Sequence, residues 1–139
     1  MKKFLVNQSI KNKIKFVFEE SIELFKDENK LHLSSDCIQS RKILEAIIES
    51  SIELADPELK LSHDLMGNIE KLNNTGQISN WIYSMFHTLR VFGNNGAHFQ
   101  DKENKYPERL FTKDLIVIHG TLSRVLEFYK SFIEIKKQD

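Results

Sequence analysis

The chain has few of the residues that interrupt helices and few of those that crosslink small domains. Its 139 residues include five glycines, two prolines and one cysteine, Cys37. A single cysteine excludes an intrachain disulfide framework and is typical of a reducing compartment. Internal repeats, low-complexity linkers and strand-like alternation are nearly absent. These absences favour one all-α domain over residues 1–139, since a chain of this length buries a core of its own.

The chain has neither an excess of charge of one sign nor a long hydrophobic run. Twenty basic and 20 acidic residues cancel, so no whole-molecule field attracts nucleic acid or anionic lipid. No apolar run approaches the roughly 20 residues that span a bilayer, and the opening MKKFLVNQSIKNK is not typical of a signal peptide. We therefore expect a cytoplasmic protein with no membrane partner, in which any binding of RNA or nucleotide depends on a local patch.

Apolar residues recur at spacings of three and four in five segments, as in amphipathic helices. The expected helices run over about residues 8–27, from Ser34 or Ser35 to Ala55, from a cap at Ser62 to the NNTG turn at 73–76, from Ser79 to a break near Gly93, and from Thr112 to the lysine-rich end. Cys37 and Trp81 are expected among the core residues. The pattern predicts an all-α bundle of five helices.

Glycine, asparagine and histidine gather in the stretch LRVFGNNGAHFQ, residues 89–100. Arg90 and Asn94 are four residues apart, so they share a face wherever the helix continues, and His98 follows one turn or one short loop later. Glycine commonly ends helices in a left-handed conformation. We therefore expect the helix to break or kink near Gly93. Arg90, Asn94 and His98 would then lie together around the break.

These three side chains suit the chemistry of phosphate. Arginine offers a planar fork of donors to phosphoryl oxygens, histidine titrates near neutrality and can move a proton, and asparagine can orient either one. RNA cleavage by this route needs no metal, because a base takes the 2′-OH proton while a cation stabilises the phosphorane charge. Without helical His-x-x-x-His or carboxylates clustered at ligand spacing, the sequence predicts no metal site and no cofactor.

A purely structural interpretation stays open beside the catalytic one. Asn94 then caps the broken helix, His98 bonds a carbonyl in the turn, and Arg90 pairs with a carboxylate such as Glu45. Arg41 and Glu45 are four residues apart on the second helix, and we interpret them as a brace for the Arg90 segment. The remaining histidines are assigned to ordinary packing or solvation: His32, His63, His87 and His119.

An ordered string of short motifs resembles a helical domain-of-unknown-function family that occurs alone or attached to type I restriction subunits and other defence proteins. That family has an Arg-x-x-x-Glu pair on an early helix, a short helix with a glycine-containing turn, then an arginine, Gly-Asn and Ala-His. The resemblance covers roughly residues 30–135 and falls on Arg41, Glu45, Gly76, Arg90, Gly93, Asn94, Ala97 and His98.

The family in turn resembles a branch of the HEPN superfamily (higher eukaryotes and prokaryotes nucleotide-binding). These are helical bundles, and many are metal-independent RNases of defence and toxin systems with a composite site at a homodimer interface. Their active signature separates arginine and histidine by four to six positions, whereas seven separate Arg90 from His98. Either a break at Gly93 brings the pair together, or Asn94 to His98 is the retained half of a degenerate site.

The resemblance implies a homodimer that acts on RNA or binds nucleotide in a prokaryotic defence or toxin setting. His98 is then the general base or acid, Arg90 stabilises the charge on phosphate, and Asn94 orients one of them. The alternative is a non-catalytic interaction module that binds a partner such as a restriction or antitoxin subunit.

Overall fold

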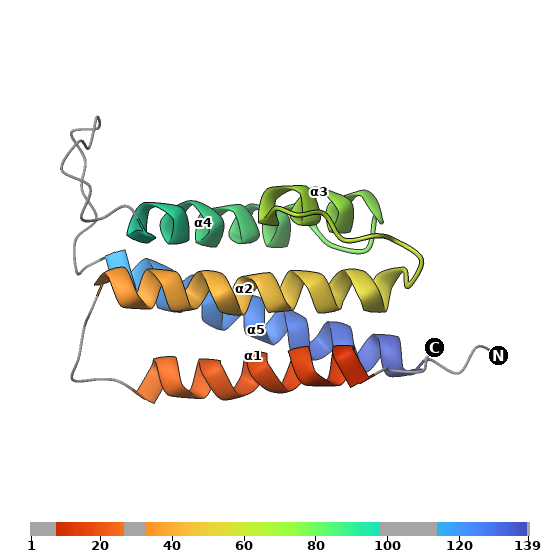
Figure 1. The fold of residues 1–139 in the computed structure, drawn as a ribbon, viewed down its shortest axis with the longest axis horizontal. Helices are drawn as coiled ribbons and strands as arrows, with labels where there is room; N and C mark the ends of the chain where they lie inside the picture. Colours follow the sequence, from red (N-terminus) through yellow and green to blue (C-terminus); the bar gives the residue numbers. More distant parts are fainter. Residues whose placement is uncertain (1–7, 27–32, 98–113, 139) are drawn as a thin grey trace.

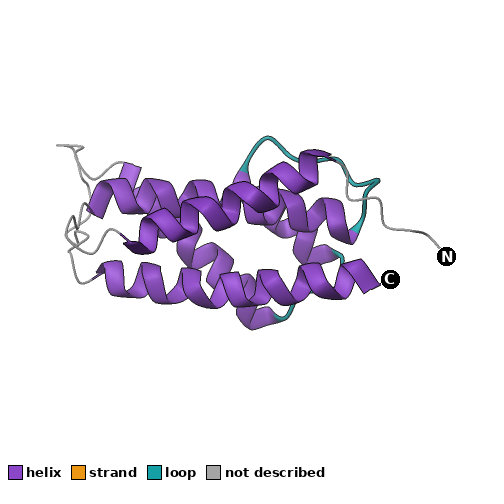
Figure 2. Ribbon diagram, turned by 90° about the horizontal axis from the view of Figure 1, so that it is seen from below, coloured by secondary structure: helices purple, strands orange, loops and turns teal. Residues whose placement is uncertain are grey.

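The computed structural model describes residues 8–26, 33–97 and 114–138, and all the regular structure in these ranges is helical (Figure 2). The helices are α1 (Gln8–Lys26), α2 (Leu33–Ala55), α3 (Leu65–Asn74), α4 (Asn80–Ala97) and α5 (Asp114–Gln138). The prediction of an all-α bundle of five helices is confirmed for this part of the chain. Thr112, the expected start of the last helix, lies outside it.

Helix α2 occupies the centre of the bundle and packs against all four other helices. Figure 1 shows α1 on one side of α2 and the α3–α4 pair on the other, with α5 alongside α2. Helices α1 and α4 run opposite to α2, and α5 runs in the same direction as α2 (Figure 1). The apolar side chains that α2 buries are Cys37, Ile43, Leu44, Ala46, Ile47, Ile48, Ile52 and Leu54. The placement of Cys37 in the core is thus confirmed.

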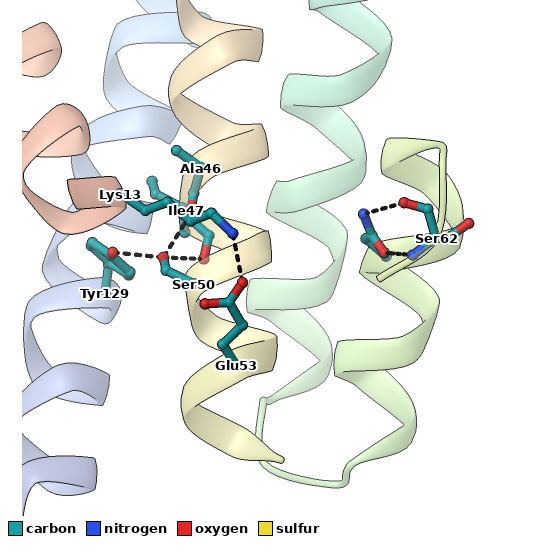
Figure 3. Close-up of polar contacts among 8 residues, drawn as sticks. Lys13, Ala46, Ile47, Ser50, Glu53, Ser62 and Tyr129 are labelled. Atoms are coloured by element: carbon teal, nitrogen blue, oxygen red, sulfur yellow. Dashed lines mark hydrogen bonds and ion pairs between the residues drawn. The ribbon is translucent and has the colours of Figure 1, made fainter. Parts of the chain in front are cut away.

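The N-cap of helix α3 lies two residues later than expected. The Asp64 carboxylate accepts the Gly67 amide at 2.7 Å and is the N-cap. The backbone of Ser62 instead bonds the Asn68 side chain, with its amide 2.6 Å from Oδ1 and its carbonyl 3.2 Å from Nδ2 (Figure 3). The prediction of a Ser62 cap is therefore wrong, because Asn68 holds that residue beside the helix and not at its start.

The chain reverses between α3 and α4 at the predicted turn. Gly76 has a φ of 72°, a conformation that glycine adopts without the Cβ penalty of other residues. Ser79 then opens α4, since its hydroxyl accepts the Ile82 amide at 3.4 Å. The expected turn at 73–76 and the expected helix start at Ser79 are both confirmed.

Gly93 does not interrupt α4, which runs through it to Ala97. A Cβ built on Gly93 would lie 2.7 Å from Cβ of Arg41 and 3.2 Å from its Cγ and Cδ. Gly93 is thus the point where α4 closely approaches α2, and glycine serves close packing there and not a turn. The predicted break near Gly93 is wrong, and so is the interpretation of Asn94 as the cap of a broken helix.

Trp81 lies at the edge of the bundle, not in its core. Ile82, Phe86 and Leu89 recur at helical spacing and are buried, whereas Trp81 is 50% exposed. The guanidinium carbon of Arg124 lies 5.1 Å from the centroid of the Trp81 ring and covers part of it. The expected core position of Trp81 is wrong because one residue of offset along a helix turns a side chain about 100° away from the buried face.

A buried hydrogen bond joins α2 to α5 in the middle of the core. The hydroxyl of Tyr129, whose side chain is fully buried, lies 2.7 Å from Oγ of Ser50 (Figure 3). Ser50 itself donates to the carbonyl of Ala46 at 2.6 Å, so the phenol is the donor of the bond between them. Burial raises the pKa of Tyr129 to about 12. The phenol therefore stays protonated and able to donate at neutral pH.

Removing the Ser50 hydroxyl and removing the Tyr129 hydroxyl should lower the free energy of unfolding by different amounts. Ser50→Ala leaves the Tyr129 hydroxyl buried without its acceptor and should lower the free energy of unfolding by about 1–3 kcal/mol. Tyr129→Phe leaves Ser50 bonded to Ala46 and should lower it by only about 0.5–1.5 kcal/mol. The double variant should resemble Tyr129→Phe in urea unfolding followed by circular dichroism. Single effects that simply add in the double variant would contradict this assignment of the bond.

Candidate functional site

The candidate residues on α4 lie along one unbroken helix. Arg90 and Asn94 are both half-buried. Asn94 follows Arg90 by four positions of helix, so the two share a face and their Cα atoms are about 6 Å apart along the axis. His98, the third member of the predicted site, lies outside the described residues. Its position relative to Arg90 stays a prediction.

Of the supporting residues Arg41 and Glu45, Arg41 meets α4 at Gly93. The Nε atom of Arg41 lies 3.5 Å from Oε1 of Glu45, and the two side chains are 38% and 42% exposed. The aliphatic part of Arg41 lies against Gly93, three residues from Arg90. An exposed ion pair of this kind stabilises by only about 0.3–0.5 kcal/mol. The packing of the Arg41 stem is therefore the main contribution of the pair to the α2–α4 contact, and the role of the pair as a brace stays a prediction.

A polar cluster that the sequence did not predict joins α3 to α4. The α3–α4 cluster consists of Glu70 from α3 and Tyr83, His87 and Arg90 from α4. Nε of Arg90 donates to Nδ1 of His87 at 3.1 Å, and Nε2 of His87 lies 3.1 Å from Oε1 of Glu70. Tyr83 donates its hydroxyl to the same carboxylate oxygen. Its ring meets that of His87 at 84° with centroids 4.7 Å apart.

Three of the four members of this cluster carried a signal in the sequence. Tyr83, His87 and Arg90 are spaced by four and three residues, the spacing of one helical face. Glu70 is 17 residues before His87 and on another helix, so chain spacing alone cannot connect it to the others. His87 is half-buried, at 21% exposure, and its two ring nitrogens have partners. Ordinary packing or solvation therefore does not describe it fully.

The hydrogen bond from Arg90 assigns the roles of the two ring nitrogens of His87. The guanidinium of Arg90 can only donate, so Nδ1 of His87 accepts and Nε2 carries the proton shared with Glu70. The hydrogen bonds from Tyr83 and His87 lower the pKa of Glu70, while the bond to Glu70 raises the pKa of Tyr83. The cluster thus combines a carboxylate, an imidazole, a phenol and a guanidinium.

Two other classes of site are absent from the described ranges, and one shallow depression lies apart from the α3–α4 cluster. Within residues 8–26, 33–97 and 114–138, no three His, Cys, Asp or Glu side chains come together as a metal-binding group. None of the five helices has both the length and the apolar character of a membrane span. A shallow depression of about 490 Å³ lies along α1 and Ala46. It lacks the paired acid–base groups found between α3 and α4.

Comparison with known proteins places the candidate site inside a recognised domain. Residues 19–129 match a family described as "Domain of unknown function (DUF4145)". Neither the curated proteins nor the solved structures yield a significant match. The matched range includes all of α2, α3 and α4, and with them the Arg41–Glu45 pair and the α3–α4 cluster. Because the match spans most of the 139 residues, the chain belongs to the DUF4145 family.

Proposed function

We propose that this chain is a HEPN-like domain that cleaves RNA without a metal ion, in a defence or toxin setting. The observation that supports this most is the state of Arg90, a half-buried cation whose Nε is held by His87 and whose helix carries Asn94 one turn later. A guanidinium held through Nε keeps its Nη groups for phosphoryl oxygens. Arg90, to which the resemblance assigns the binding of phosphate, is therefore preorganised. Preorganisation favours the stabilisation of charge in a transition state.

The proposed roles of the three residues are those that the resemblance implies. Arg90 stabilises the negative charge on the phosphorus oxygens, His98 transfers a proton, and Asn94 orients one of them. Because α4 is unbroken at Gly93, no kink there shortens the separation of Arg90 and His98. Positions 90, 94 and 98 nevertheless recur every four residues, the period of one helical face.

An RNA-degradation assay with matched variants tests this proposal. The purified chain should cleave a mixed-sequence single-stranded RNA in the presence of EDTA, and Arg90→Ala and His98→Ala should each remove the cleavage. The exposed residues Lys15 and His63 provide controls, since Lys15→Ala and His63→Ala remove a cation and a histidine outside the site. Circular dichroism should show the same helical content in all variants.

Three results would contradict the proposal in different ways. Absence of RNA cleavage by the native chain would reject the activity. Full activity of His98→Ala would remove that residue from the mechanism. Activity that EDTA removes and Mg²⁺ or Mn²⁺ restores would show a metal-dependent reaction instead.

Assembly provides a separate prediction. The Arg90, Asn94 and His98 set supplies one proton-transfer group, whereas transphosphorylation benefits from a base and an acid. A two-fold axis close to residues 90–98 would bring a second copy of the set to the same site. Light scattering should therefore report a dimer at micromolar concentrations. A monomer at these concentrations, or a dimer with the two segments on opposite outer faces, would reject the composite site.

A second candidate function, binding of a partner protein, has one observation in its favour. The first turn of α5 exposes two aliphatic side chains, Ile116 at 77% and Val117 at 45%, and exposed apolar groups of this kind occur at protein interfaces. This function predicts no RNA cleavage. It also predicts that Ile116→Asp weakens binding to a restriction or antitoxin subunit without changing the helical content. A partner bound equally by native chain and variant would reject it.

A further inference from the structure

Glu70 is the member of the α3–α4 cluster that comes from α3, and two side chains of α4 donate to it. Tyr83 donates its hydroxyl to Oε1 of Glu70, and Nε2 of His87 lies 3.1 Å from the same oxygen. These two hydrogen bonds lower the pKa of Glu70. Glu70 is therefore an acceptor at neutral pH, and the packing of α3 on α4 places it beside one nitrogen of His87.

The bond to Glu70 decides which nitrogen of His87 can accept a hydrogen bond. A neutral imidazole carries one proton, on either Nδ1 or Nε2. Because a carboxylate can only accept, Glu70 favours the tautomer with the proton on Nε2 and leaves a lone pair on Nδ1. That lone pair faces Nε of Arg90, 3.1 Å away. In the other tautomer Nδ1 would carry a proton and could not accept from Arg90.

The hydrogen bond from Nε determines how Arg90 can bind phosphate. A guanidinium offers parallel donors on two kinds of edge, one that includes Nε and one formed by the two Nη groups. Because Nε donates to His87, two parallel bonds to a phosphoryl group must come from the Nη edge. An imidazole accepts one hydrogen bond at this place, whereas a carboxylate would accept two. His87 is therefore suited to hold Arg90 at Nε alone.

We propose that Glu70 is a positioning residue for phosphate recognition: it fixes the tautomer of His87, which holds Arg90 so that a phosphoryl group meets the Nη edge. The inference rests on the proposed function, because it takes Arg90 as the group that binds phosphate. The hydrogen bond from Arg90 to His87 is kept in both the free and the bound state. The ligand is a phosphoryl group that accepts two parallel bonds through two of its oxygens.

The direction of one change separates positioning from simple electrostatics. The negative charge of Glu70 repels phosphate, so a role through charge alone predicts that its removal strengthens binding. A role through His87 predicts the opposite. Without the carboxylate, the second tautomer of His87 becomes populated and Arg90 loses its acceptor, so phosphate binding weakens.

Glu70→Gln tests this direction, because a glutamine can donate as well as accept and so suits both tautomers of His87. The variant should bind a single-stranded 2′-deoxy oligonucleotide, which lacks the hydroxyl needed for cleavage, about tenfold more weakly than the native chain, as expected for the loss of one hydrogen bond. Fluorescence anisotropy measures the affinity, and circular dichroism compares the helical content.

Asp36→Asn is the matched control for this variant. Asp36 also lies beside a histidine, 3.3 Å from Nε2 of His119, but the ring of His119 packs edge-on against Phe25. The change of carboxylate to amide is the same as in Glu70→Gln. It should leave the affinity for the oligonucleotide unchanged.

His87→Asn shows whether Glu70 acts through His87. The amide oxygen of an asparagine is an acceptor that does not depend on a tautomer, so Arg90 no longer needs Glu70 to provide one. Adding Glu70→Gln to His87→Asn should therefore change the affinity by less than about twofold. The same loss in both backgrounds, or equal or tighter binding by Glu70→Gln alone, would overturn the positioning role while the proposed function stands.

A measurement on the native chain does not depend on the fold of any variant. In ¹⁵N NMR spectra, His87 should show the tautomer protonated at Nε2. Inorganic phosphate should shift the Nη resonances of Arg90 while Nδ1 of His87 stays hydrogen-bonded. A tautomer protonated at Nδ1, or loss of that bond on addition of phosphate, would overturn the positioning role. A native chain that binds neither the oligonucleotide nor phosphate, or an Arg90→Ala variant that binds as tightly, would overturn the proposed function as well.

Discussion

A Gly93→Leu variant should lose the folded state, or at least about 3 kcal/mol of its free energy of unfolding, because α4 has no room for a side chain there. The first carbon of any side chain would lie 2.7 Å from Cβ of Arg41. That atom is attached to the backbone of α2 and cannot swing aside, so the two helices would have to separate. Overpacking by one or two carbons typically costs about 1–3 kcal/mol, which we expect for Gly93→Ala. Urea unfolding at equilibrium measures both variants.

Gly120 provides the matched control for this prediction. It also lies within a helix, α5, but a Cβ built there meets nothing within 4 Å. Alanine stabilises an exposed helical position by up to about 1 kcal/mol relative to glycine, so Gly120→Ala should raise the free energy of unfolding. The two alanine variants should therefore differ in sign. A stabilising Gly93→Ala would show that α2 and α4 are farther apart than described.

Cys37 should react with a disulfide reagent such as DTNB at least about 100-fold more slowly in the folded chain than in the chain unfolded by urea at pH 8. Its side chain is 0% exposed. Burial, followed by the charges of Asp36 and Asp114, raises the pKa of the thiol from 9.0 to about 11. This change alone lowers the reactive thiolate fraction about 100-fold. Rapid labelling under native conditions would contradict the buried position of Cys37.

The same pKa change predicts how stability depends on alkaline pH. A thiol whose folded pKa is raised contributes stability that is present below its unfolded value of 9.0 and is lost as the pH rises through about 11. Tyr129 contributes in the same way, because burial raises its pKa from 10.0 to about 12 and its contribution to stability is lost between these two pH values. The free energy of unfolding should thus fall from pH 9 upward, and Cys37→Ala should flatten the lower part of that fall. An equally steep fall in the variant would assign the loss to other groups.

The helices could be predicted from the sequence because their signals are local. The period of apolar residues placed the end of α1 within one residue of Lys26, and polar turn residues located the chain reversal at Gly76. The role of Gly93 could not be predicted in this way. Whether a glycine ends a helix or admits a neighbouring one depends on what lies opposite. Here that is Arg41, 52 residues earlier in the chain.

In the candidate site, too, the features set by local spacing could be predicted and those set by tertiary contacts could not. The shared face of Arg90 and Asn94 follows from helical spacing alone. The partners that hold Arg90 do not, because Glu70 reaches His87 only after α3 packs beside α4. Hydrogen-bond partners of this kind come from tertiary contact, which leaves no periodic trace in a single sequence. His98, its role in catalysis and the homodimer stay predictions.

The central position of α2 also bears on how this domain can diverge. Three buried serines on α2, Ser40, Ser50 and Ser51, are small enough to let neighbouring helices come close, and all four other helices pack on α2. A new side chain in α2 must therefore fit against several helices at once, whereas a new side chain on the outer face of α1 or α3 contacts mostly water. Among relatives, correlated substitutions should thus often have one member in α2, even where the second lies on a helix at the far side of the bundle.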